Sequence, residues 1–356
     1  MTKRLIFIFL FLSTNSNAQS NIGIEAKFDY GALLVHHYYM EHLAERHFPM
    51  FEFAILKQTK GKKGWECNRN LPVFGVKYIY GTLSSPRYLG SGQSVLPYMC
   101  ISYIRRKKIT INCQYGWGLG YIKKPFESNI NYRNIAIGSH FNAVANIANE
   151  IEYRLNDKTR FNLGLSFVHF SNGSFKVPNL GINLASVSIG GKFFIKNPIY
   201  VKQDSIDNPD SKNEFSICGA IGMKEIYPIG GSRYTVGIVS LGYWRNYSCK
   251  GKYGVSLDLF YDEGIKGYVM RDTIETNNST SLFQMGLIGG YEFRIGKIGL
   301  PYMIGIYIVD AYKGNGLFYN RIGGRYYINE HLIANITLKT HFAKADFFEY
   351  GLSYRF

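Results

Sequence analysis

A strict alternation of side-chain character over residues 109–121, "ITINCQYGWGLGY", constrains the fold of this chain more than any other feature. Every odd position is apolar or aromatic, and every even position is polar or glycine. Successive side chains of a β-strand point to opposite faces of the sheet, so the pattern predicts a strand with one apolar and one polar face. The segment is also long for a strand of a soluble sheet.

The same alternation ends the chain, in "FEYGLSYRF" (348–356), where the even positions are aromatic or apolar. About sixteen such segments, from 22–30 to 346–356, are separated by short and long polar connections. A soluble sandwich would bury the apolar face, whereas a membrane barrel turns that face to lipid and lines its lumen with the polar face. Short turns at one end, long loops at the other and a terminal aromatic residue are typical of a membrane barrel.

The first 18 residues predict export. A basic start "MTKR" precedes the apolar run "LIFIFLFL" and a polar stretch that ends at Ala18, which is the pattern of a cleaved signal peptide. Eight apolar residues are too few for a spanning helix, which needs about 20. We therefore expect residues 1–18 to be a signal peptide and residues 19–356 to form an all-β, transmembrane, antiparallel up-and-down barrel of about 14–16 strands in the bacterial outer membrane.

The charge and the cysteines restrict the partners. Loss of Lys3 and Arg4 with the signal peptide lowers the net charge from +16 to +14. In an exported protein, this excess favours anionic lipid or lipopolysaccharide over nucleic acid as a partner. The five cysteines are odd in number and include no C-x-x-C pair, so a metal site is not expected. The cysteines could form one disulfide, between Cys218 and Cys249, or could serve as small apolar side chains that fill space. Whether the protein forms a homo-oligomer stays open.

A His and a Ser end the strand predicted over residues 159–171. His169 and Ser171 share the apolar face of that strand with Leu163 and Leu165, and they lie at its outer end. Polar groups on a lipid-facing surface are costly unless they are paired. Asn183 lies on the same face of the next predicted strand. The three side chains are therefore expected to meet on the outside of the barrel wall.

This grouping has the composition of a hydrolytic site. Ser171 would be the nucleophile and His169 its general base. Asn183 would hold the imidazole in one tautomer, the role of the third member of a triad. The Asn179 side chain and nearby backbone amides would donate to the oxyanion. A hydrolase whose nucleophile faces lipid would cleave an ester in a lipid, and a Ser–His mechanism needs no metal or organic cofactor.

The segment "HFSNGSFKVPNLGIN" (169–183) resembles the motif of the lipid A 3-O-deacylase (PagL-like) family of outer-membrane barrels. The resemblance implies that His169 is the base, Ser171 the nucleophile and Asn179 the oxyanion donor, and Asn172 and Gly181 match further motif positions. The acid of the family falls on Asn183, which carries no charge. A looser resemblance covers residues 20–200, in which "NYRNIAIGSHFN" (131–142) looks like a segment of longer members called acyloxyacyl hydrolases.

These observations predict an outer-membrane serine esterase that removes an ester-linked acyl chain from lipid A of the outer leaflet. Residues 19–200 would form a deacylase-like half, and residues 213–356 would add strands to the same barrel, although the long connection 196–213 could also divide two halves. The alternatives are a phospholipase that uses the same residues, a porin, and a barrel without catalytic activity. Calcium-dependent activity, solute flux and lipid A binding without turnover would indicate these three alternatives, respectively.

Overall fold

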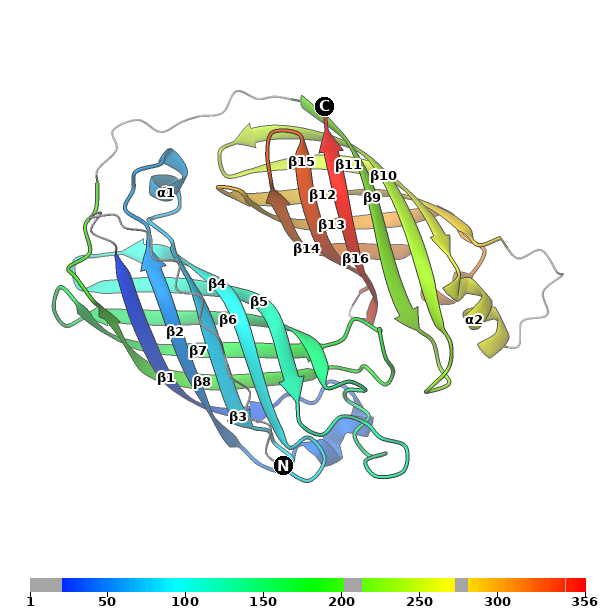
Figure 1. The fold of residues 1–356 in the computed structure, drawn as a ribbon, viewed down its shortest axis with the longest axis horizontal. Helices are drawn as coiled ribbons and strands as arrows, with labels where there is room; N and C mark the ends of the chain where they lie inside the picture. The colour runs from blue at the N-terminus through cyan, green and yellow to red at the C-terminus, as the bar shows by residue number, and fades with distance from the viewer. Residues whose placement is uncertain (1–20, 202–212, 273–280, 343) are drawn as a thin grey trace, which may run out of the picture.

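Two closed eight-stranded antiparallel barrels make up this computed structural model (Figure 1). It describes residues 21–201, 213–272, 281–342 and 344–356. The expected signal peptide, residues 1–18, lies outside the described residues. No helix in the described part of the chain is long and apolar enough to cross a membrane.

The first barrel contains the strands that precede residue 195, with one 3-10 helix and one short α-helix in its connections. Its elements are β1 (Ile22–Leu33), η1 (Tyr38–Leu43), β2 (Phe48–Gln58), α1 (Gly64–Asn68), β3 (Val73–Thr82), β4 (Ser91–Arg105), β5 (Ile109–Ile122), β6 (Phe141–Arg154), β7 (Thr159–Ser171) and β8 (Ile182–Phe194).

The second barrel follows residue 212. Its elements are β9 (Asn213–Glu225), β10 (Arg233–Ser248), β11 (Gly251–Asp262), α2 (Gly264–Arg271), β12 (Phe283–Ile295), β13 (Ile298–Val309), η2 (Lys313–Asn315), β14 (Phe318–Tyr327), β15 (Leu332–His341) and β16 (Lys344–Arg355).

The prediction of an all-β antiparallel barrel is confirmed, but the expectation of one continuous wall is wrong. β8 pairs back with β1 over eleven residue pairs, from Gly23↔Phe194 to Leu33↔Leu184, and β16 pairs with β9. Each set of eight strands thereby satisfies its own edge hydrogen bonds, which is what closure of a barrel accomplishes. The strands after residue 213 therefore belong to a second barrel instead of extending the first.

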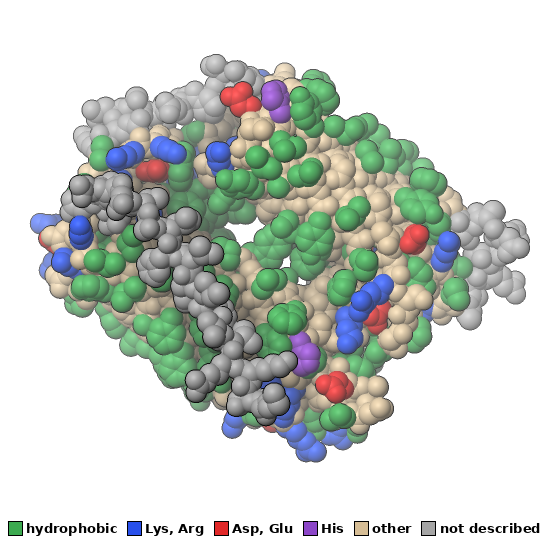
Figure 2. Space-filling model, in the orientation of Figure 1, with side chains coloured by type: hydrophobic (Ala, Val, Ile, Leu, Met, Phe, Trp, Pro, Cys, Tyr) green, Lys and Arg blue, Asp and Glu red, His purple; other side chains and the backbone are tan. Residues whose placement is uncertain are grey.

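Both barrels are apolar outside and charged inside. Along β5, Tyr115 and Leu119 of the predicted apolar face are exposed, whereas Asn112 and Gln114 of the polar face are buried in the lumen. Figure 2 shows hydrophobic side chains spread over the visible walls. A surface of this kind suits contact with lipid, and the interior suits ion pairs.

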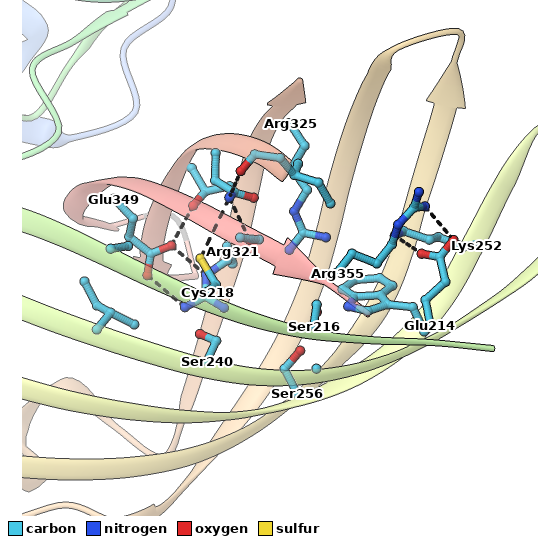
Figure 3. Close-up of a pocket in the computed structure, with 18 residues that line it drawn as sticks. Glu214, Ser216, Cys218, Ser240, Lys252, Ser256, Arg321, Arg325, Glu349 and Arg355 are labelled. Atoms are coloured by element: carbon cyan, nitrogen blue, oxygen red, sulfur yellow. Dashed lines mark hydrogen bonds and ion pairs between the residues drawn. The ribbon is translucent and has the colours of Figure 1, made fainter. Parts of the chain in front are cut away.

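Ion pairs and hydrogen bonds fill the lumens. In the first barrel, the Lys77 Nζ donates to Glu52 at 3.1 Å and to Gln114 at 2.7 Å. In the second, the Arg321 guanidinium donates to both carboxylate oxygens of Glu349, at 2.6 and 2.9 Å (Figure 3). The cavity drawn in Figure 3 has a volume of about 30 Å³, which is room for one or two water molecules. Such a lumen is not an open pore.

The two ends of each barrel differ in their connections. One end, the turn end, carries the short turns 106–108, 155–158, 249–250, 296–297 and 328–331. The opposite end, the loop end, carries most of the longer connections, including 123–140 and 172–181. Buried apolar side chains, among them Met40 and Leu43 of η1, close the loop end of the first barrel. The helix α2 packs with Ile226 and Tyr312 at the loop end of the second.

The barrels touch each other along their length. Near the turn end, the Arg69 guanidinium donates to the Arg294 carbonyl oxygen at 2.8 Å. Midway, the rings of Trp117 and Phe348 lie 6.2 Å apart between centroids. Near the loop end, the Ser174 hydroxyl donates to the Ala345 carbonyl oxygen at 2.8 Å. The two halves thus lie side by side, and β3–β7 of the first share the lining of a pocket with β13–β16 of the second.

Candidate active site

The register of β7 and β8 brings His169 and Asn183 together. These residues are direct partners across the strand pair, and both point out of the barrel. On the other side of β7, Ala143 pairs with Ser171 and Ala145 with His169. The predicted shared face is therefore confirmed. The two alanines leave open space beside the His and the Ser, on the side away from Asn183.

A chain of hydrogen bonds fixes the tautomer of His169. The His36 Nε2 lies 2.8 Å from the Leu180 carbonyl oxygen, which can only accept, so the Nε2 carries a proton. The Nδ1 of a neutral His36 then accepts from the Asn183 Nδ2, 3.0 Å away. This orientation turns the Asn183 Oδ1 toward the His169 Nδ1, at 2.5 Å. The His169 Nδ1 must therefore donate, which leaves its Nε2 unprotonated and able to accept a proton.

Hydrogen-bond donors converge on the Ser171 hydroxyl oxygen. The backbone N–H of Asn172 donates to the Asn179 Oδ1 at 2.9 Å, and this sets the orientation of the Asn179 amide. The Asn179 Nδ2 then donates to the Ser171 Oγ at 3.0 Å, and the Gly173 N–H donates to it at 3.2 Å. No hydrogen bond of the described residues joins His169 to Ser171. The hydroxyl is held by the loop in this state.

Two further motif residues support this arrangement. Gly181 adopts a φ of +88°, and a Cβ there would lie 2.8 Å from the His169 Cε1, so only glycine leaves room for the imidazole. The Asn172 Nδ2 donates to the Ser139 Oγ at 2.8 Å and to the Lys176 carbonyl oxygen at 2.7 Å. Asn172 thereby ties the loop after the nucleophile to the connection between β5 and β6.

Comparison with known families identifies the chain. Residues 50–192 match the lipid A 3-O-deacylase (PagL) family, and residues 213–356 match the C-terminal domain of acyloxyacyl hydrolase. The chain belongs to the lipid A 3-O-deacylase family. This membership makes it a hydrolase-family protein of the outer membrane and supports lipid A deacylation as its activity. It also confirms the resemblance seen in the motif.

Two solved structures resemble this deacylase-family chain only weakly. Neisserial surface protein A matches with 10% identity and a TM-score of 0.35, over 49% of this chain and 97% of its own. A mutant porin of Rhodopseudomonas blastica matches with 10% identity and a TM-score of 0.18, over 95% of this chain and 100% of its own. No curated protein matches the chain.

Two pockets meet at the candidate site of the deacylase-family chain, and both lie between the barrels. The apolar pocket, of about 550 Å³, extends toward the turn end. It is lined mainly by apolar side chains and glycines, including Trp117, Ala145, Ile322, Gly324, Leu338 and Phe348. Figure 2 shows an opening in the middle of the molecule, between the two halves, with hydrophobic side chains around it.

The polar pocket, of about 490 Å³, lies at the loop end. Its wall includes His36, Arg271 and Lys344. Arg271 is paired with Asp272 at 2.6 Å, and hydrogen bonds from Arg271 and Tyr312 lower the pKa of that carboxyl group to about 2. Lys344 is exposed and has no ion pair among the described residues.

The second barrel changes the environment predicted for the site. Along the outward face of β7, Leu165 is 65% exposed, whereas Ser171 is only 8% exposed. The prediction that this face meets lipid thus holds for the part of β7 near the turn end. The part of β7 near the loop end faces the second barrel. The sequence analysis did not identify His36 or Ser139 as site residues. No local pattern marks either residue, because each reaches the site from a distant connection.

Proposed function

We propose that the chain is a serine esterase that removes an ester-linked acyl chain from lipid A, with Ser171 as nucleophile and His169 as general base. The observation that carries this proposal is the fixed tautomer of His169. Its Nδ1 is committed to Asn183, so its Nε2 is free to take a proton on the same face of the wall as Ser171. General base catalysis needs a proton acceptor of this kind within reach of the hydroxyl.

The reaction would proceed in two steps. A rotation of the Ser171 side chain toward the His169 Nε2 places the hydroxyl for attack. The Oγ bonds to the acyl carbonyl carbon, its proton passes to the Nε2, and the sugar hydroxyl leaves with that proton as the ester bond breaks. Water then attacks the acyl carbonyl carbon and gives a proton to the His169 Nε2. The bond to the Ser171 Oγ breaks, the Oγ takes up that proton, and the fatty acid leaves.

The donors around Ser171 supply the oxyanion site. The Asn179 Nδ2 and the Gly173 N–H already lie 3.0 and 3.2 Å from the Oγ. When the Oγ turns to the substrate, both donors are free for the carbonyl oxygen as it gains charge. Loss of one such donor typically costs about 10²–10³ in turnover, so the pair is a substantial part of the proposed catalysis.

Asn183 takes the position of the usual acid. Its Oδ1 orients the imidazole, but a neutral amide cannot stabilise the imidazolium by charge. Neutralising the acid of a serine protease triad costs about 10⁴ in turnover, largely because the His adopts the wrong tautomer. Here His36 fixes the amide and therefore the tautomer, which removes that part of the cost.

We also propose the setting of the reaction. The loop end would face the outer leaflet, where lipid A resides, and export would depend on cleavage after Ala18. A porin function has less support, because buried ion pairs fill the lumen of the second barrel. No feature of the site favours phospholipid over lipid A.

Mass spectrometry of lipid A incubated with the refolded protein tests the proposal. Wild type should remove one acyl chain, and Ser171→Ala should leave lipid A intact. Ser166→Ala is the matched control, because this serine lies on the lumen side of the same strand. Equal deacylation by wild type and Ser171→Ala would exclude Ser171 as the nucleophile. If folded wild-type protein leaves lipid A intact, the proposed esterase function is wrong.

A further inference from the structure

We infer that the second barrel forms the far wall of the substrate site, so that the acyl chain of the lipid is bound between the two barrels. This inference rests on the proposed esterase function and assigns a role to residues 213–356. The occupant is a single saturated acyl chain attached to an anionic sugar headgroup.

The apolar pocket has the surface that an acyl chain requires. Its volume of about 550 Å³ lies within the range of about 300–1,000 Å³ typical of small-molecule sites. The first barrel contributes Trp117 and Ala145, and the second contributes Ile322, Leu338 and Phe348. Burial of hydrocarbon against such a wall is favourable, so affinity should increase about fourfold for each methylene added to the chain.

The loop after the nucleophile packs against the second barrel. A Cβ at Gly173 would lie 2.4 Å from the Phe348 ring, so the backbone that carries an oxyanion donor touches that ring directly. The Ser174 hydroxyl and carbonyl oxygen also bond to the second barrel, through the Ala345 carbonyl oxygen and the Glu225 N–H. The second barrel is therefore in contact with the candidate active site, as well as with the pocket.

The candidate nucleophile lies where the two pockets join. His169, Ser171 and Leu338 line both the apolar and the polar pocket. An amphipathic lipid bound with its chain toward the turn end and its headgroup toward the loop end would place its ester at that junction. In the polar pocket, the exposed Lys344 of β16, which lies within electrostatic range of the Asp272 carboxylate, supplies a positive charge for a headgroup phosphate.

Gly324→Phe tests the acyl wall. A Cβ at Gly324 would meet only the Trp117 ring, at 3.5 Å, so a side chain there would project into the apolar pocket without backbone strain. Gly237→Phe is the matched control, because Gly237 points outward from β10, lies outside this pocket and has nothing within 4 Å of its Cβ position. The assay compares kcat/KM for lipid A bearing a long acyl chain with that for a soluble aryl butyrate ester.

Gly324→Phe should lower kcat/KM for long-chain lipid A about tenfold, which is the effect of excluding about two methylenes. It should leave butyrate hydrolysis unchanged, and Gly237→Phe should change neither. Equal rates on long-chain lipid A for wild type and Gly324→Phe would overturn the inference while the esterase function stands. Absence of Ser171-dependent hydrolysis of both substrates by wild type would instead overturn the proposed function.

Lys344→Gln provides a second, surface variant that should not disturb folding. It should raise KM for phosphorylated lipid A and leave KM for dephosphorylated lipid A unchanged. The same KM for wild type and Lys344→Gln on both lipids would remove the second barrel from headgroup binding and restrict the inference to the acyl chain.

Discussion

The Nδ1 of His169 lies 2.5 Å from the Oδ1 of Asn183, directly across the β7–β8 pair. A carboxylate would accept from the imidazole in either orientation, but an amide does so in only one. The orientation of Asn183 depends on His36, whose Nδ1 accepts from the other end of the amide. The proposed base is thus prepared by two residues, one on the neighbouring strand and one in a loop.

Two substitutions of Asn183 should distinguish orientation of the His169 imidazole from stabilisation of the imidazolium by charge. Asn183→Leu removes the acceptor for the His169 Nδ1 and should lower kcat by about two to four orders of magnitude, since the tautomer is no longer selected. Asn183→Asp keeps an acceptor and adds a charge that favours the imidazolium, so its kcat should equal or exceed that of wild type. Steady-state kinetics on lipid A would measure both variants. A fully active Asn183→Leu would show that Asn183 does not position the base.

His36 should affect kcat only when residue 183 carries an amide side chain. His36→Phe removes the acceptor that orients Asn183, and we expect kcat to fall about tenfold with little change in KM. In the Asn183→Asp background the same substitution should have little effect, because either carboxylate oxygen can accept from His169. A double-mutant cycle on kcat measures this coupling. Additive effects of the two substitutions would contradict the proposed relay.

Gly181→Ala should damage activity more than stability. The added Cβ would lie 2.8 Å from the His169 Cε1, and displacement of the ring by a fraction of an ångström should lower kcat about 10–100-fold. Gly316→Ala is the control, because Gly316 has a similar φ of +83° but nothing within 4 Å of its Cβ position. Urea unfolding should show a loss of about 1–3 kcal/mol from backbone strain in each variant. Normal activity of Gly181→Ala would rule out the predicted contact with His169.

Arg321 should stabilise the second barrel strongly. Arg321→Met leaves the buried carboxylates of Glu349 and Asp258 without their cation and should lower the free energy of unfolding by about 3–5 kcal/mol. Arg154→Met, which breaks an exposed pair with Asp157, should change it by only about 0–1 kcal/mol. Equilibrium unfolding in urea, with the protein in micelles, compares the two. Equal effects of the two substitutions would mean that ion pairs in the lumen contribute no more to the free energy of unfolding than exposed ion pairs do.

The sequence predicted the strands and their faces well, because period-two alternation is a local property. It placed the first strand at 22–30 and the last at 346–356, and the structure has Ile22–Leu33 and Lys344–Arg355. The outward faces of β5 and β16 are also those predicted. The closure into two barrels was not predicted, because alternation does not specify which strand edges pair. Only the long connection 196–213 indicated that the chain could divide into two halves.

The candidate site was predictable in part for the same reason. His169, Ser171 and Asn183 could be placed on one face by counting along two neighbouring strands. His36, Leu338 and Phe348 could not be, since their positions depend on a loop conformation and on how the two barrels pack. The catalytic roles of His169, Ser171 and Asn183 stay a prediction.

One chain carries both barrels, and this has a consequence for how the enzyme would respond to dilution in the membrane. A site built between separate subunits loses activity when the lipid-to-protein ratio rises, because the partners must meet by lateral diffusion. Covalent connection replaces that encounter with a fixed local concentration. Specific activity in proteoliposomes should therefore be independent of protein density, and sparse enzyme molecules would work at full rate.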